Sequence, residues 1–276
     1  MSNKPDAIFQ IASDPSDITK YLFLNISSLA SSAIKDHGCF SIALSGGSLP
    51  KFLTGLSNLY QEHTLDPQFD KWHIFLADER CVPSTHDDSN LKNIQEKFLN
   101  HVVGIPSDQV YGIDESLLEK GSEAVASSYE MNIVKKLLDS CGGRIDCAVL
   151  GFGPDGHTCS LFPNHALLKE SSKLVASIDD SPKPPPSRIT LTYPVLNDAR
   201  GVIFCGTGSS KGPILKDSFA SIKKISDENV AYICHATTRC PSDESPLYPC
   251  ARVKPESAVV WVLDKAATED LDISEE

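Results

Sequence analysis

Apolar positions near the start of the chain repeat with the period of an amphipathic helix. Side chains at spacings of four, four, three and four residues fall on one helical stripe, namely Ile18, Leu22, Ile26, Leu29 and Ala33. Ser16 or Asp17 is predicted to cap this helix, and Gly38 is predicted to end it. The segment before Gly38 is therefore expected to be a long surface helix with one buried face.

Short apolar runs then alternate with helical patterns along the whole chain. Strands are predicted at 39–44, 72–77, 146–150, 189–192, 201–205 and 259–263, and helices at 51–60, 89–98, 122–138, 211–220 and from 265. Such alternation predicts an α/β fold, a mostly parallel sheet with helices on both faces. The length of 276 residues suits a single domain over 1–276. The proline-rich segment 181–186 and the polar segment 237–249 are predicted to be surface loops.

Charge limits the classes of partner. The chain has 37 acidic and 25 basic residues and a formal net charge of −12, which argues against nucleic acid or an anionic membrane as the main partner. An anionic small molecule would have to be held by local cations and glycine-rich turns. No apolar run approaches the roughly 20 residues that cross a bilayer, and no secretory signal pattern is present, so a cytoplasmic location is expected. The oligomeric state is left open, with a monomer as one possibility.

Nine cysteines form no CxxC pair, and an odd number cannot all pair within one chain. Reduced thiols are therefore predicted. Cys234, His235, Cys240 and Cys250 lie close in sequence, but their spacing matches no usual zinc pattern. No metal site is expected.

One strand signal runs directly into a turn that ends in a histidine. Residues 147–150 are apolar, and Gly151, Gly153 and Gly156 then allow a sharp bend before His157. Ligands gather at the carboxyl ends of strands in open α/β sheets, and an imidazole titrates near neutrality. His157, with Asp155 beside it, is thus a candidate base for activating water. The alternative is a loop histidine that only caps the next helix.

A second turn of the same kind suits an anion. Ser45, Gly46, Gly47 and Ser48 follow the strand ending at Leu44 and precede a predicted helix. Backbone N–H groups in such a turn, together with the amino end of a helix, favour phosphate binding. A plain tight turn is the alternative interpretation.

Three charged residues, at 78–80, directly follow the apolar strand predicted at 72–77. Arg80 could grip a phosphate or sugar oxygen, with Asp78 or Glu79 holding it or binding sugar hydroxyls. For Glu79 an internal ion pair at the strand end is an equal alternative. Residues 87–90 are predicted mainly to cap the helix at 89–98.

Two further cations are candidates. Arg188 stands between the proline-rich segment and a strand, where it could reach a ligand or face solvent. Lys211 follows a third glycine-containing turn at the start of a predicted helix, an unfavourable place for a cation unless an anion binds nearby.

Two other chemistries fit poorly. Ser160 and Cys159 do not stand in a GxSxG nucleophile elbow. The spacing Gly151-x-Gly153-x-x-Gly156 resembles a dinucleotide motif, but Pro154 and Asp155 would crowd and repel a pyrophosphate.

With these residues assembled, the chain resembles 6-phosphogluconolactonases of the glucosamine-6-phosphate isomerase/6-phosphogluconolactonase superfamily. The resemblance extends from the first helix to 261–267. The matching blocks are the turn at 45–48, the block 78–83 with 88–90, the block 151–163 and the block 188–190.

The resemblance implies a Rossmann-like fold of the NagB/RpiA/CoA-transferase type and hydrolysis of 6-phospho-D-glucono-1,5-lactone in the oxidative pentose phosphate pathway. It implies no metal or organic cofactor, His157 as the base, and a substrate site formed by the turn at 45–48 with Arg80, Arg188 and Lys211.

Two alternatives stay open. The deaminase branch of the superfamily shares the GxGxDGH block, but there an acidic residue follows, whereas here 158–163 contains no carboxylate. The pocket could also bind a sugar phosphate without turning it over.

Overall fold

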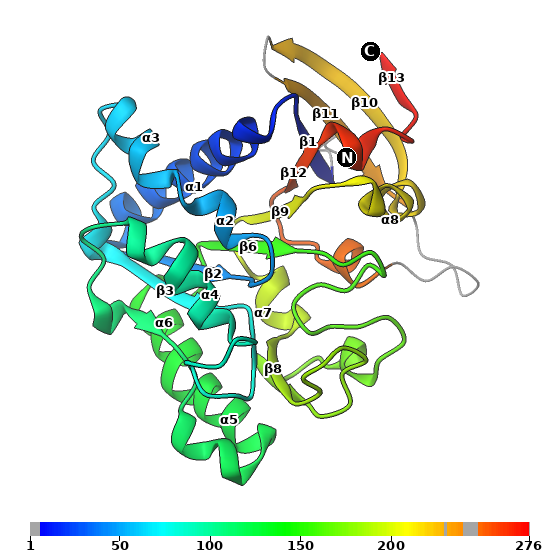
Figure 1. Cartoon of the computed structure of the whole chain (residues 1–276). Coiled ribbons are helices and arrows are strands. Elements are labelled where there is room, and N and C mark those ends of the chain that lie inside the picture. Colours follow the sequence, from blue (N-terminus) through cyan, green and yellow to red (C-terminus); the bar gives the residue numbers. More distant parts are fainter. Residues whose placement is uncertain (1–5, 229–230, 240–247, 276) are drawn as a thin grey trace.

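The structure is a computed structural model that describes residues 6–228, 231–239 and 248–275. A ten-stranded sheet runs through the molecule in the order β13-β10-β11-β1-β12-β9-β6-β2-β3-β5 (Figure 1). Its strands are β1 (Ala7–Ala12), β2 (Phe40–Leu44), β3 (Trp72–Leu76), β5 (Val110–Tyr111), β6 (Cys147–Gly151), β9 (Val202–Gly206), β10 (Phe219–Glu228), β11 (Ala231–Thr238), β12 (Val259–Asp264) and β13 (Ile273–Glu275).

Each neighbouring pair of strands from β1 to β5 in this order is parallel, whereas β1 pairs antiparallel with β11 on its other side. Each of β2 and β9 is buried along its whole length, as expected for strands covered on both faces. The predicted α/β fold with a mostly parallel sheet is therefore confirmed, and the polar turns that follow β2, β6 and β9 meet at one edge of the sheet.

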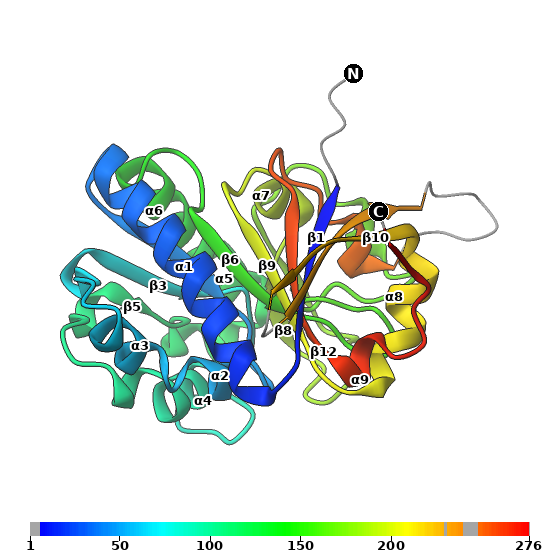
Figure 2. The ribbon, with the colours of Figure 1, turned by 90° about the horizontal axis from the view of Figure 1, so that it is seen from above.

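Helices cover both faces. Figure 1 shows α1, α2 and α3 on one side of the central strands and α5, α6 and α7 on the other. The long helix α1 lies along the parallel strands, contacting β1, β12, β9, β6 and β2 (Figure 2). The α-helices are α1 (Pro15–His37), α2 (Pro50–Leu53), α3 (Leu56–Glu62), α4 (Asn90–Lys97), α5 (Ser122–Tyr129), α6 (Lys135–Ser140), α7 (Tyr193–Asn197), α8 (Gly212–Ser218) and α9 (Lys265–Thr268).

Short helical turns complete the connections. They are 3-10 turns at η1 (Phe69–Lys71), η2 (Leu99–His101), η3 (Ser107–Gln109), η4 (Glu115–Lys120), η6 (Ala166–Lys169), η7 (Ser209–Lys211) and η8 (Pro249–Arg252), and a π-helical turn at η5 (Glu130–Val134).

The predicted carboxyl end of α1 is confirmed, and the predicted cap at its amino end is wrong. Gly38 ends the helix in the left-handed conformation, at φ 85°. At the other end the cap is Asp14, not Ser16 or Asp17: Pro15 fits the first helical position, and Asp14 accepts a hydrogen bond from the Ser16 N–H at 2.9 Å. Asp17 instead accepts from the Asp14 N–H at 3.0 Å, which completes a capping box.

Three predicted helices are divided or shortened. The helix expected at 51–60 is two short helices, α2 and α3, with a break at Thr54 and Gly55. The helix expected at 122–138 is α5 and α6 joined by the π turn. The helix expected at 211–220 ends at Ser218, where the chain enters β10.

A second sheet of three antiparallel strands stands beside the first. It consists of β4 (Asp78–Arg80), β8 (Arg188–Leu191) and β7 (Val175–Ile178), in that order. The chain leaves β3 at Ala77 and enters β4 directly, and α5 packs on β7 and β8. The predicted strand at 189–192 therefore exists, but it belongs to this antiparallel sheet.

Several strands were not predicted from sequence. They include β1, β7 and the long pair β10 and β11, which pair antiparallel with each other and continue the large sheet beyond β1. The proline-rich segment 181–186 is a loop as predicted. Of the loop predicted at 237–249, Thr237 and Thr238 belong to β11, while 240–247, including Cys240, lie outside the described residues.

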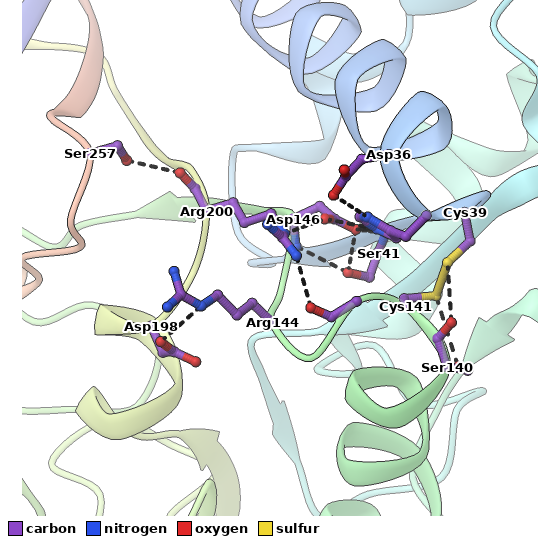
Figure 3. A network of polar contacts seen from close by, with 12 residues as sticks. Asp36, Cys39, Ser41, Ser140, Cys141, Arg144, Asp146, Asp198, Arg200 and Ser257 are labelled. Carbon is purple, nitrogen blue, oxygen red and sulfur yellow. Dashed lines mark hydrogen bonds and ion pairs between the residues drawn. A yellow bond between two sulfur atoms is a disulfide. The ribbon is translucent and has the colours of Figure 1, made fainter.

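The amino-terminal edge of the parallel strands is held by a polar network and a disulfide (Figure 3). Buried Asp146 accepts from the Ser41 N–H and Oγ at 2.9 Å each. It also lies 3.2 Å from His37 Nε2 and 3.2 Å from Arg200 Nε. These contacts join α1, β2 and the segments before β6 and β9.

Cys39 forms a disulfide with Cys141, with their Cα atoms 5.9 Å apart. The prediction that all the thiols are reduced is therefore wrong for these two, because folding brings together cysteines 102 positions apart. Within the part of the chain that the structure describes, no helix is long and apolar enough to cross a membrane.

Candidate active site

A cavity opens at the carboxyl ends of β2, β6 and β9, next to the small sheet. All of the site residues predicted from sequence except Asp155 line it: Ser45, Gly46, Gly47, Ser48, Asp78, Arg80, His157, Arg188 and Lys211. The structure thus brings together residues from five separate stretches of the chain. Asp155 lies just outside this lining, against the imidazole of His157.

The turn after β6 fixes the imidazole of His157 against Asp155. His157 Nδ1 lies 2.5 Å from Asp155 Oδ1, and the Gly153 N–H donates to the His157 carbonyl at 2.9 Å. A Cβ at Gly153 would stand 2.1 Å from the imidazole, and Gly156 adopts a φ of 77°. Thr158 and Leu161 form a β-bridge after His157. The alternative that His157 caps a following helix is therefore wrong.

The surroundings of His157 set its protonation. Burial lowers the pKa of His157 below its ordinary value of 6.5, although the hydrogen bond and the charge of Asp155 act in the opposite direction. Burial would raise the pKa of Asp155, but the contacts with His157 and Lys183 lower it to about 2. The carboxylate thus stays ionised and holds the proton on Nδ1, so Nε2 is the ring nitrogen left for a reaction.

Phe162 supports the imidazole from one side. Its ring stacks on that of His157 with the centroids 4.9 Å apart and the planes at 25°. Phe162 is 2% exposed, so the imidazole rests on a rigid apolar surface. Sequence reasoning assigned it no role, because an aromatic residue in an apolar run is ordinarily core.

Lys183 was also not predicted as a site residue. Its Nζ lies 3.2 Å from Asp155 Oδ2 and 3.1 Å from His157 Nδ1. The residue belongs to the proline-rich loop, 26 positions from His157. A single lysine in a surface loop gives no sequence signal for such a contact.

The turn at 45–48 is tightly packed against α4. A Cβ at Gly46 would lie 1.9 Å from Asn90 Oδ1, and Gly47 has a φ of 66°. Asn93 Nδ2 donates to the Gly47 carbonyl at 2.8 Å. The following helix α2 has only four residues, so the expected field of a long helix is absent at this turn. Anion binding by the turn stays a prediction.

Asp78 and Glu79 have contacts other than those expected. Asp78 is buried and accepts from Ser160 Oγ at 2.7 Å and Asn90 Nδ2 at 3.3 Å. Ser160 is thereby engaged, which agrees with the rejection of a serine nucleophile. Burial likewise raises the pKa of the Cys159 thiol well above 9.0.

Glu79 caps helix α4. Its carboxylate accepts from the N–H groups of Asn90 at 2.7 Å and Leu91 at 2.9 Å, and from Ser89 Oγ at 3.1 Å. Burial raises the pKa of Glu79, although these hydrogen bonds to the backbone oppose the rise. Among the described residues Glu79 forms no ion pair, so that alternative is wrong, and a contact of Glu79 with a ligand stays a prediction. Ser89 is the N-cap residue, as expected for 87–90.

Arg80 and Arg188 stand directly opposite each other on β4 and β8. Like charges in this position are destabilising unless an anion lies between them. Arg80 Nη1 donates to the Asp88 carbonyl at 2.7 Å, while its buried Nε has no hydrogen-bond partner among the described residues. A free donor and two facing cations suit a phosphoryl group.

Arg188 is buried and hydrogen-bonded to the protein, which its position in the sequence does not indicate. It is only 3% exposed, and burial, followed by the charge of Arg80, lowers the pKa of its guanidinium. Its Nε and Nη2 donate to carbonyls of the proline-rich loop. The alternative that Arg188 faces solvent is therefore wrong, contact with the ligand stays a prediction, and Arg188 also holds this loop.

Lys211 points its Nζ at the Phe152 carbonyl, with which it forms a hydrogen bond. Burial lowers the pKa of this ammonium, and the positive charge of Lys183 adds to the effect. Lys211 thus faces the cavity as a partly desolvated cation, for which a bound anion would be a favourable partner.

Comparison with known proteins agrees with this fold. The sequence profile described as glucosamine-6-phosphate isomerases/6-phosphogluconolactonase matches residues 13–261. The chain belongs to this family of sugar-phosphate proteins.

Similar relatives carry the name of one branch. The chain is 39% identical over 245 residues to 6-phosphogluconolactonase 3, chloroplastic, from Arabidopsis thaliana, covering 86% of this chain and 67% of that protein. It is 34% identical over 275 residues to 6-phosphogluconolactonase from Rattus norvegicus, covering 99% and 97%. The solved structure of 6-phosphogluconolactonase from Trypanosoma brucei superposes with a TM-score of 0.71 at 26% identity, covering 98% of this chain and all of that one.

Proposed function

We propose that this chain hydrolyses 6-phospho-D-glucono-1,5-lactone to 6-phospho-D-gluconate, a step of the oxidative pentose phosphate pathway. The observation that carries the proposal is the imidazole of His157, tethered through Nδ1 to Asp155 at 2.5 Å, in the same cavity as the facing arginines Arg80 and Arg188. A positioned base and a separate group of cations are what an esterified sugar acid with a phosphoryl end requires. The names of the relatives support the same activity.

His157 acts as the general base on water. As the water oxygen bonds to the lactone carbonyl carbon, Nε2 takes the water proton, and Asp155 stabilises the imidazolium that forms. When the tetrahedral intermediate collapses, the bond from the carbonyl carbon to the ring oxygen breaks and Nε2 returns the proton to that oxygen. The ring opens to the free acid, and the imidazole is neutral again.

The cations hold the phosphoryl end and orient the ring. Arg80, Arg188 and Lys211 are assigned to the phosphate, and Asp78 with the turn at 45–48 to the sugar side of the cavity. The oxyanion of the intermediate is assigned to backbone N–H groups of a glycine turn or to a nearby cation. Neither a metal nor an organic cofactor is assigned a step.

The test is a coupled assay on freshly prepared lactone, with a control lacking enzyme because such lactones hydrolyse spontaneously. Glucosamine 6-phosphate is the second substrate, and a third arm uses protein dialysed against EDTA. Hydrolysis above the control, no ammonia from glucosamine 6-phosphate and no loss after EDTA are expected. Ammonia release would favour the deaminase alternative, and tight binding without turnover would favour the binding protein.

We further propose a cytoplasmic location, because the thiols of Cys81, Cys147, Cys159, Cys205 and Cys250 are not in disulfides, although Cys39 and Cys141 form one. The Arabidopsis relative is named chloroplastic, so the compartment differs within the family. Subcellular fractionation followed by immunodetection tests the proposal, and recovery mainly in an organelle would contradict it.

A further inference from the structure

Two hydrogen-bond donors converge on the carboxylate of Asp155. One is Nδ1 of His157, at 2.5 Å from Oδ1. The other is Nζ of Lys183, at 3.3 Å from Oδ1 and 3.2 Å from Oδ2. An ionised carboxylate has about four acceptor positions, so it can serve both donors at once. Lys183 Nζ and His157 Nδ1 are consequently only 3.1 Å apart.

The position of Lys183 is built into the fold. Arg188 Nη2 donates to the Lys183 carbonyl at 2.8 Å and to the Pro184 carbonyl at 3.1 Å, and Arg188 Nε donates to the Pro185 carbonyl at 2.9 Å. Ser181 Oγ donates to the Lys183 carbonyl at 2.8 Å. A buried guanidinium thus fixes the backbone of this loop, although the Lys183 side chain is 39% exposed.

We propose that Lys183 is a positioning residue for proton transfer, which shares the Asp155 carboxylate with His157 and thereby keeps the resting imidazole neutral, with Nε2 ready to accept a proton. The kinetic consequence rests on the proposed hydrolase function. The effect on the protonation of His157 does not, because it can be measured in the free protein.

The reason is electrostatic. A carboxylate in contact with an imidazole favours the charged imidazolium, and a protonated base cannot take a proton from water. The ammonium of Lys183 neutralises part of the Asp155 charge and repels a proton on His157. Burial is the main cause of the lowered pKa of His157. The positive charge of Lys183 lowers this pKa further.

Other charged groups also face the imidazole. The charge of Asp78 on β4 favours the charged form of the His157 imidazole. Arg188 on β8 lies 5.7 Å from the centre of the Phe162 ring, on which the imidazole stacks. Arg80 and Lys211 line the same cavity. All of these remain when Lys183 alone is changed, so that substitution isolates its effect.

The experiment compares Lys183→Met, Lys183→Gln and Lys183→Arg with the natural protein. The matched control is Lys173→Met, which removes a lysine that pairs with Glu123 at 2.8 Å, away from the cavity. The titration of His157 in the free protein is followed by NMR of imidazole nitrogens, assigned with a His157→Gln variant, and kcat/KM for the lactone is measured against pH. Thermal melting confirms that each variant is folded.

Lys183→Met and Lys183→Gln are expected to raise the titration midpoint of His157. At a pH below this raised midpoint, kcat/KM as a fraction of its high-pH plateau should be at least about threefold lower in these two variants than in the natural protein. Lys183→Arg and Lys173→Met should follow the natural profile within about twofold. A purely structural role would lower kcat/KM by the same factor at all pH values.

An unchanged midpoint in both neutral variants, or an equal rise in Lys173→Met, overturns the proposal. Absence of lactone hydrolysis by the natural protein would instead refute the proposed function, and the NMR titration would still decide the role of Lys183. If Lys183→Met does not fold, Lys183→Gln carries the test.

Discussion

The imidazole of His157 has one ring nitrogen bound to Asp155 and the other left for the cavity. Three groups contact it: the carboxylate of Asp155 in the turn after β6, the ring of Phe162, and the ammonium of Lys183 in the proline-rich loop. At the scale of the residue, the chemistry therefore depends on how the side chain is held rather than on its type alone. Other histidines of the chain with a carboxylate partner, such as His165 with Asp180 at 3.0 Å, lie outside the cavity lining.

Replacing His157 by Ala is expected to lower kcat for the lactone about 10²–10⁴-fold, because the general base is lost. KM should change only a fewfold, since the cations that bind the phosphoryl group remain. Steady-state kinetics on fresh lactone measures both constants. His165→Ala is the matched control and should retain normal kinetics; a near-normal kcat in His157→Ala would remove the proposed base.

The pH dependence of kcat/KM follows from the direction of the His157 pKa in the free protein. Its folded pKa lies below the ordinary value of 6.5, and the neutral imidazole is the active form. The value of kcat/KM is therefore at its maximum at neutral pH, and it decreases as the pH falls through this lowered pKa. A profile of kcat/KM against pH, which reports the free enzyme, should show its acid limb below about 6.5. An acid limb at higher pH would contradict the assignment of His157 or the neutral resting state.

Arg80 and Arg188 are expected to differ although they face each other. Arg80→Ala should raise KM about 10- to 100-fold with kcat largely kept, because one charged hydrogen bond to the phosphate is lost. Arg188→Ala should lower kcat as well, because this arginine also holds the loop that carries Lys183. Steady-state kinetics and competition by inorganic phosphate test both variants. Unchanged phosphate inhibition in both would refute the phosphate site.

At the scale of elements, the charge of Asp146 ties together segments that lie far apart in the sequence. Its carboxylate is 1% exposed and contacts Ser41, His37 and Arg200 (Figure 3). These contacts join α1, β2 and the start of β9 at the edge opposite the candidate active site. Removing one charge from such a buried network leaves the remaining charges without a partner, which is destabilising.

Asp146→Asn is therefore expected to lower the free energy of unfolding by about 2–4 kcal/mol. Catalysis at 25 °C should stay within about twofold, since the network lies away from the cavity. Urea denaturation and the lactone assay give the two quantities. Asp198→Asn is the control, because Asp198 is 55% exposed and pairs with the exposed Arg144. An equal loss of stability in both variants would show that Asp146 has no special role.

Elements were predicted best where the local pattern is strong. The stripe of α1 and the apolar strands β2, β6, β9 and β12 were found because burial on one or both faces leaves a direct pattern in the sequence. The break at Gly55 and the π turn after α5 were missed, since they follow from packing around the helix. β10 was not predicted: its first two residues were assigned to the helix at 211–220 and the others to no element, because its alternation is interrupted by lysines.

At the scale of the whole molecule, the Cys39–Cys141 disulfide closes a long loop. The two residues are separated by 102 positions, so the cross-link restricts the unfolded chain considerably. Reduction is expected to lower the free energy of unfolding by about 2–4 kcal/mol. The melting temperature, measured with and without dithiothreitol, should fall on reduction, whereas Cys39→Ser should melt at one temperature in both conditions. A natural protein whose melting does not respond to reductant would contradict a stabilising disulfide.

The sequence alone determined the class of fold and the turns that form the candidate site. The turn at 45–48 and the block ending in His157 each consist of neighbouring residues after a buried strand, and parallel strands bring such ends to one edge. Local pattern and this one rule of topology suffice for that part of the result.

Only the tertiary structure placed Arg80 opposite Arg188, brought Lys183 to Asp155, turned Glu79 to the end of α4 and joined Cys39 to Cys141. Each of these contacts joins segments that are separated in the chain. Their geometry depends on strand register and on the paths of the connecting loops, which are set by packing of the complete molecule. No pattern within a short stretch of sequence encodes them.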